Sequence, residues 1–157
     1  KKRAALAESI QAKVEEVPEW QIKTSLQTSV QILKRHRDIH FSDKQDAKPV
    51  SIIITTLAAR AYDNQAGVYD ALSSIVQNIE ANWGKPGFVE FRNGKWWVAN
   101  PVDDGENFAD KWNEYPERRE AFMTWVKKVR NDFTLAVSKG TLNESCTHWP
   151  WCSADAP

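Results

Sequence analysis

Two polar side chains on neighbouring predicted helices have the types and positions needed to hold a phosphate group. Lys34 lies in a stretch, 23–41, whose apolar residues recur at helical spacing. Ser51 opens a second predicted helix, and Pro49 blocks that helix from extending backward. A helix amino end with free backbone N–H groups and a hydroxyl is a ready anion site. Lys34 and Ser51 are therefore predicted to face one phosphate; the alternative is a solvated lysine beside an ordinary helix cap.

The first of these helices has an unusual distribution of cations. At about 100° per residue, Lys23, Gln27, Lys34 and Asp38 line up along one edge of the apolar face. Arg37 falls nearer the middle of that face. A cation beside an apolar surface is unfavourable unless an anion meets it. The pattern thus predicts a cationic seam that faces an anionic group.

The second helix is harder to assign from its residues. Its beginning, 50–56, is rich in β-branched side chains and favours a strand. The following residues, 57–62, favour a helix. Twelve residues without a break suit a helix better than a strand. We predict a nearly all-apolar, buried helix with Ser51 as its N-cap.

The remaining pattern predicts a mainly α fold, a helical bundle with one small β-hairpin. The stretch 68–83 has the spacing of an amphipathic helix, and Pro116 opens a last long one. A short helix is expected over 106–112, after an irregular loop whose Asn and Asp side chains should bond their own backbone.

A hairpin is predicted at about 86–99. Two short aromatic runs flank an Asn-Gly pair there, which is a strong hairpin signal. Trp96 and Trp97 are expected to pack on the helices, because an isolated hairpin is marginally stable. Stacking of a nucleobase on either ring is the alternative.

Composition excludes several classes of protein. The 157 residues contain 21 Lys and Arg and 21 Asp and Glu, so the net charge is zero. A protein that coats nucleic acid needs a basic excess. No apolar run approaches the roughly 18 residues of a membrane span. The two cysteines do not make a disulfide framework, and a reducing cytoplasm is the expected location.

The two ends of the chain differ from its centre. A charged N-terminal linker helix is expected over 1–19, a helical domain over 20–140 and a Trp- and Cys-rich tail over 141–157. In the tail, Cys146, His148 and Cys152 are potential zinc ligands that need a fourth from elsewhere, for instance His36 or His40. The alternatives are a disulfide on oxidation, or docking of the tail through its tryptophans.

Three separated phrases carry a family resemblance that covers roughly 20–133. They read KTSLQTSVQILKRHRDIHF, PVSIIITTLAARAY and NPVDDGENFADKW. In this order they resemble the carboxy-terminal helical half of the bacterial cGAS/DncV-like nucleotidyltransferases. These are cyclic-oligonucleotide synthases of anti-phage signalling, related to cGAS and oligoadenylate synthase. The resemblance implies that the chain is the C-terminal half of a two-lobed enzyme.

The resemblance also implies roles for particular residues. In the family, a lysine on the first helix and a serine at the start of the next hold the triphosphate of a bound nucleotide; the matching residues are Lys34 and Ser51, with Lys23 a weaker candidate. The family's catalytic half carries a Gly-Ser loop and an Asp-x-Asp pair that binds magnesium. This chain contains neither. Catalytic residues and Mg²⁺ ligands are thus expected on an absent half, and the chain alone is expected to be inactive and to bind no metal.

The resemblance implies synthesis of cyclic oligonucleotide second messengers from ATP- and GTP-type nucleotides, in the cytoplasm, as part of antiviral defence. One alternative is an interaction module that HORMA-type regulators or ubiquitin-transfer (E1/E2-like) partners bind through the C-terminal tail. Another is a helical domain whose tryptophans serve packing alone. The residues leave these alternatives open.

Overall fold

The computed structural model describes residues 24–138 and confirms the mainly α prediction. Its elements, in chain order, are α2 (Ser25–His40), the 3₁₀ turn η1 (Gln45–Ala47), α3 (Ser51–Ala61), α4 (Val68–Ala81), β1 (Glu90–Arg92), β2 (Lys95–Trp97), α5 (Lys111–Glu114) and α6 (Pro116–Ser138). The two strands form one antiparallel pair in the part of the chain that is described.

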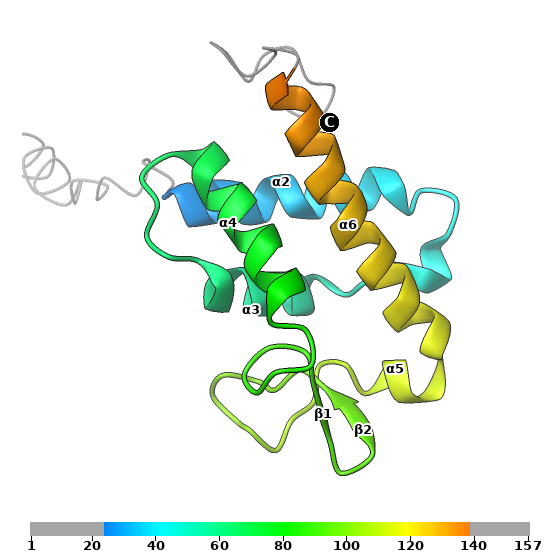
Figure 1. Ribbon diagram of the computed structural model, residues 1–157. Helices are drawn as coiled ribbons and strands as arrows, with labels where there is room; N and C mark the ends of the chain where they lie inside the picture. Colours follow the sequence, from blue (N-terminus) through cyan, green and yellow to red (C-terminus); the bar gives the residue numbers. More distant parts are fainter. Residues whose placement is uncertain (1–23, 139–157) are drawn as a thin grey trace, which may run out of the picture.

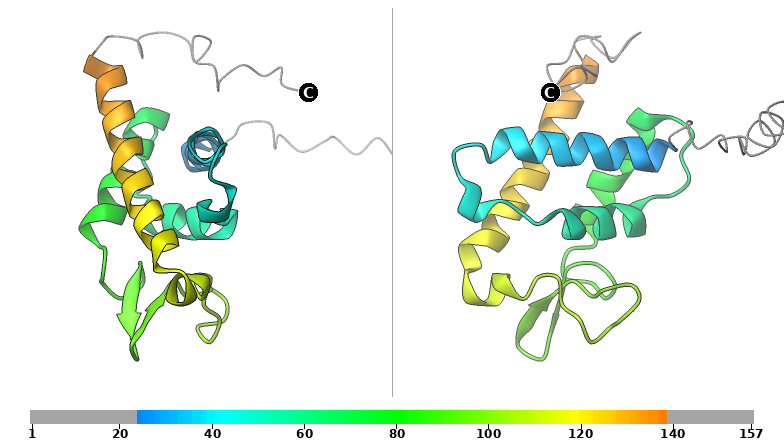
Figure 2. Two further views of the ribbon diagram at one scale, coloured as in Figure 1. Left: turned by 90° about the vertical axis from the view of Figure 1, so that its right-hand side faces the viewer. Right: turned by 180° about the vertical axis from the view of Figure 1, so that it is seen from behind.

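The helices form two layers. Helices α2 and α3 lie side by side and antiparallel in one layer, and α4 and α6 lie side by side across them in the other (Figure 1 and Figure 2). The hairpin, the loop after it and α5 gather at one end of the molecule. This arrangement buries one face of each long helix and leaves the outer flank of α2 and α3 accessible.

Local chemistry explains where the helices begin. Thr24 caps α2: its hydroxyl accepts a hydrogen bond from the Gln27 backbone N–H, and the Gln27 side chain accepts one from the Thr24 backbone N–H. Pro116 opens α6, as predicted, because its fixed φ suits a first helical turn. The short helix predicted over 106–112 is wrong in its bounds. Asn107 forms an isolated antiparallel bridge with Ala99, residues 108–110 form a turn, and the helix begins only at Lys111.

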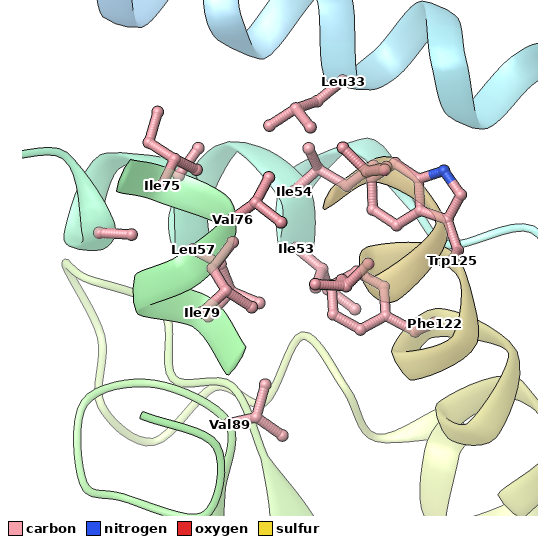
Figure 3. Close-up of a cluster of buried hydrophobic side chains, with 14 of the residues drawn as sticks. Leu33, Ile53, Ile54, Leu57, Ile75, Val76, Ile79, Val89, Phe122 and Trp125 are labelled. Carbon is pink, nitrogen blue, oxygen red and sulfur yellow. The ribbon is translucent and has the colours of Figure 1, made fainter. Parts of the chain in front are cut away.

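The core joins all four long helices. Ile53, Ile54 and Leu57 of α3 are almost fully buried, which confirms the prediction of an apolar, buried helix there. They pack against Leu33 of α2 and against side chains of α4 and α6 (Figure 3). A residue such as Leu57, with no exposed surface, contributes about 2 kcal/mol through burial of its side chain. This core fixes α2 and α3 relative to each other.

The predicted hairpin is present, and Trp96 packs on the core as expected, whereas Trp97 lies under the Arg92 guanidinium, 4.2 Å from its ring centroid, and outside the core cluster. Asn93 and Gly94 have φ of 51° and 75°, the left-handed conformations that a two-residue hairpin turn requires. Trp96 packs on Phe91 and Trp83, with ring centroids 5.2 Å and 5.9 Å apart. The Trp83 ring also lies against Trp112 and Phe122 of the helical core. The hairpin is thus attached to the bundle through aromatic contacts.

Several predictions fall outside the described residues. They concern the 1–19 helix, Lys23, the residues that follow 138 and the Cys146, His148 and Cys152 cluster. Among the helices that the structure does describe, none combines the length and apolar character needed to cross a membrane.

Candidate functional site

The α2–α3 pair positions both predicted phosphate ligands. At one end of the pair, the Ser25 hydroxyl lies 2.7 Å from the Tyr62 hydroxyl. At the other, Nη1 of Arg37 lies 2.7 Å from Oγ of Ser51. Two such links at opposite ends hold the helices antiparallel, with the start of α3 beside the last turns of α2. Ser51 therefore lies next to the helix that carries Lys34.

Lys34 is half-buried on the flank of α2 that faces the start of α3. At 100° per residue it falls between the directions of Arg37 and Asp38, one turn before them. Those two residues contact Ser51 and Lys48 respectively. Lys34 itself makes no hydrogen bond or ion pair with any residue between 24 and 138. Its ammonium group is therefore left for solvent or a ligand.

Ser51 is not the N-cap of α3, so this detail of the prediction is wrong. Val50 occupies the cap position with extended backbone angles, and no described side chain caps the helix. Ser51 is instead the first helical residue, and its exposed hydroxyl accepts the hydrogen bond from Arg37. The helix begins one residue earlier than predicted, so Ser51 lies past the cap position, and its hydroxyl oxygen contacts Arg37 instead of a first-turn backbone N–H. The first-turn N–H groups of α3 are thus free of side-chain caps.

The seam of cations is partly neutralised within the chain, which corrects the expectation that it faces an external anion throughout. Arg37 is only 6% exposed. Its Nε and Nη2 donate to Oδ1 of Asp38 at 3.0 Å and 2.7 Å, and its Nη1 also donates to the carbonyl oxygen of Pro49 at 3.1 Å. Asp38 and this carbonyl satisfy the buried charge that the apolar face required. Sequence reasoning missed these partners.

Asp38 is shared between two cations. Nζ of Lys48 lies 2.8 Å from the same Oδ1 that Arg37 binds. Burial alone would raise the pKa of Asp38, but hydrogen bonds from Lys48 and Arg37 outweigh burial and lower the pKa below its usual value. The carboxylate is therefore charged at neutral pH, and its charge is committed to Arg37 and Lys48 rather than to Lys34.

The opposite flank of α2 carries a buried hydrogen-bonded chain. The indole N–H of Trp125 lies 3.0 Å from Nδ1 of His36, and Nε2 of His36 lies 3.0 Å from Oδ2 of Asp132. An indole nitrogen can only donate, so Nδ1 accepts and the imidazole carries its proton on Nε2. With both nitrogens engaged, His36 is committed to α6 and is a poor candidate for the fourth zinc ligand considered above. Nothing in the periodicity of the sequence indicated this chain of bonds.

Two further groups adjoin this chain. Lys128 donates to both carboxylate oxygens of Asp132, and the distance to Oδ2 is 2.6 Å. Burial raises the pKa of Asp132, and hydrogen bonds from Lys128 and His36 lower it to a net value below the ordinary one. The pKa of His40, stacked on His36, is lowered by partial burial of its ring and by the nearby Lys128 charge. These contacts secure α2 to α6.

A broad groove of about 700 Å³ opens beside the hairpin. Ile52, next to Ser51, lines it together with Trp97 and the loop before α5. The side-chain amide oxygen Oδ1 of Asn107 accepts hydrogen bonds from the Val98 and Ala109 backbone N–H groups, both at 2.9 Å. These bonds agree with the expectation that loop Asn and Asp side chains bond nearby backbone. The groove was not predicted from sequence.

Comparison with known proteins adds an independent observation. No protein-family model matches the chain. Over 120 residues the chain is 32% identical to a protein named c-di-GMP synthase from Roseivirga ehrenbergii. The resemblance to a cyclic-oligonucleotide synthase is confirmed. The matched stretch covers 75% of this chain but 30% of the relative's length, so the chain spans less than a third of that protein.

Proposed function

We propose that this chain is the helical, nucleotide-cradling part of a longer nucleotidyltransferase that makes a cyclic oligonucleotide second messenger. The similarity to a protein named c-di-GMP synthase supports the broad activity. The single structural observation that carries the proposal is the arrangement of Lys34 and Ser51. An ammonium group without a described partner lies on the α2 flank that faces an uncapped helix start.

Each group has a definite role in this proposal. Lys34 supplies the charge that a triphosphate requires, and the Ser51 hydroxyl donates a hydrogen bond to a phosphate oxygen. The first-turn N–H groups of α3 add donors and the positive end of the helix dipole. Such groups position the triphosphate for attack by a hydroxyl on its α-phosphate, and positioning is most of what phosphoryl transfer needs from protein.

The chemistry itself is assigned to residues outside this chain. Within residues 24–138, no three His, Cys, Asp or Glu side chains gather to hold a metal ion. In this proposal, as the family resemblance implies, a magnesium ion takes its ligands from the part of the full-length protein outside this chain, and the chain alone is expected to form no product. We place the enzyme in the cytoplasm, where ATP and GTP are available, and its product in antiviral signalling.

The test is substitution in the full-length protein. Lys34→Ala is expected to raise the KM for the nucleotide roughly 10- to 100-fold, because a charge-assisted hydrogen bond contributes about 1.5–3 kcal/mol. Formation of cyclic product from labelled ATP and GTP is measured at limiting and at saturating nucleotide. Arg35→Ala is the matched control, since Arg35 is exposed on the same helix.

The result that would overturn the proposal is unchanged KM and product formation in Lys34→Ala at both nucleotide concentrations. Circular dichroism melts of each variant show whether a loss of activity comes from unfolding. Lys34 is half-buried and has no described partner, so its replacement is expected to leave the melting temperature nearly unchanged.

A further inference from the structure

Arg37 occupies an unusual position between the two proposed phosphate ligands. Its guanidinium is buried, lies on α2 one turn after Lys34, and reaches across to the first residue of α3. The sequence pattern places it in the seam of cations but gives it no role toward Ser51, and the comparison assigns it none. Its contacts divide into two sets: the Asp38 carboxylate on one side, and the Pro49 carbonyl and Ser51 hydroxyl on the other.

The direction of the hydrogen bond to Ser51 is set by chemistry. A guanidinium has N–H donors and no acceptor, so Oγ of Ser51 must accept at the 2.7 Å contact. The hydroxyl hydrogen of Ser51 therefore points away from Arg37. No residue in the described part of the chain accepts a hydrogen bond from that hydroxyl. Ser51 is exposed, so its hydrogen is directed at solvent or at a ligand.

We propose that Arg37 is a positioning residue that presents the Ser51 hydroxyl as a donor to an oxygen of a nucleoside triphosphate. This inference rests on the proposed function and deepens it. A serine hydroxyl can rotate and either donate or accept; the bond from Arg37 removes that freedom and selects a donor. The Ser51 hydroxyl can then only donate to a ligand. Ionised phosphate oxygens only accept hydrogen bonds, so they suit this hydroxyl.

Arg37 acts through Ser51 rather than on the ligand directly. Its Nε and Nη2 face Asp38, and its Nη1 faces Pro49 and Ser51. Its charge is met by Asp38, so direct phosphate binding would require the buried guanidinium to leave its carboxylate partner. The Pro49 contact also anchors the residue immediately before the α3 cap. Arg37 thus fixes the position of the Ser51 hydroxyl and makes it a hydrogen-bond donor toward any ligand.

A double-mutant cycle in the full-length protein tests the inference. Arg37→Lys keeps the positive charge but cannot reproduce the planar set of contacts to Asp38, Pro49 and Ser51. With Ser51 present, Arg37→Lys is expected to raise the KM for nucleotide about tenfold with little change in kcat. In the Ser51→Ala background the same substitution is expected to change KM by less than about twofold, because the residue through which Arg37 acts is gone.

The alternatives give different results. Equal KM increases from Arg37→Lys in both Ser51 backgrounds would overturn the inference, because a purely structural role or direct ligand contact does not depend on Ser51. Arg37→Gln provides a second variant if the lysine variant melts too early to assay. Arg35→Lys, at an exposed position of the same helix, is the matched control and is expected to change nothing.

The cycle also separates this inference from the proposed function. If Lys34→Ala and Ser51→Ala both raise KM while Arg37 and Ser51 show no coupling, the nucleotide site stands and the role of Arg37 is wrong. If Lys34→Ala and Ser51→Ala leave KM unchanged, the proposed function itself fails. Binding of ATP to the same full-length variants by calorimetry gives a second, activity-independent measure of the coupling.

Discussion

Removal of one indole N–H tests the buried chain that secures α2 to α6. Trp125→Phe deletes the donor that lies 3.0 Å from Nδ1 of His36. Both residues are buried, Trp125 to 2% exposure and His36 to 7%. Water cannot easily replace the lost donor, so Nδ1 is left unsatisfied at a cost of about 1–3 kcal/mol. The smaller ring also forfeits packing, which costs roughly 1–2 kcal/mol more.

Trp112→Phe is a matched control for the packing term. Trp112 is 3% exposed, and its ring packs against Phe122 with centroids 5.2 Å apart, much as Trp125 packs against the same Phe122 at 5.6 Å. No residue in the described range accepts a hydrogen bond from the Trp112 indole. The difference between the two variants therefore isolates the bond to His36.

The assay is urea unfolding followed by far-UV circular dichroism, because eight tryptophans make fluorescence changes hard to assign. With slopes of about 1–3 kcal/mol per molar urea, Trp125→Phe is expected to unfold at a midpoint roughly 1 M below that of Trp112→Phe. Equal midpoints for the two variants would show that the His36 bond contributes nothing, and the account of this chain would then be wrong.

Two further predictions concern pH. The pKa of Asp38 is depressed from its ordinary 3.8, so the ionised carboxylate contributes its full stabilisation above pH 3.8 and loses it as pH falls further. The difference in free energy of unfolding between wild type and Asp38→Asn should therefore shrink toward zero in strong acid. A difference that persists in strong acid would refute this account of Asp38. The pKa of His40 is depressed from 6.5, so the unfolded state binds the proton more readily and stability falls as pH drops through 6.5. His40→Gln should flatten that slope in melting temperatures measured between about pH 8 and pH 5, and an unchanged slope would show that another group controls it.

The sequence was most informative where local chemistry alone decides the structure. Asn93 and Gly94 predict their hairpin because few other residues adopt its left-handed turn. Pro116 predicts the start of a helix for a similarly local reason. The buried character of α3 followed from its composition. In each case a short segment contains the whole physical cause.

Contacts between segments were beyond this kind of reasoning. Residues i and i+1 of a helix do not face each other in the usual pattern, so periodicity gave no sign that Arg37 pairs with Asp38. The partner of Ser51 depends on how the loop before α3 returns the chain to α2. The Trp125 to His36 bond joins residues 89 positions apart. Such contacts arise from the packed arrangement and not from the pattern of any one element.

Asp38 and Asp132 each bind other side chains than Lys34, which explains how a chain of zero net charge can still leave one lysine without a carboxylate partner. Asp38 lies four residues after Lys34, the spacing at which oppositely charged helical side chains usually pair, but Arg37 and Lys48 bind its Oδ1 instead. On the other flank of α2, Asp132 is bound by His36 and Lys128. Because neither acid neutralises Lys34 and no other residue between 24 and 138 pairs with it, its charge is left for solvent or for the anion that we propose. Charge balance over the whole chain therefore does not predict charge balance at this site.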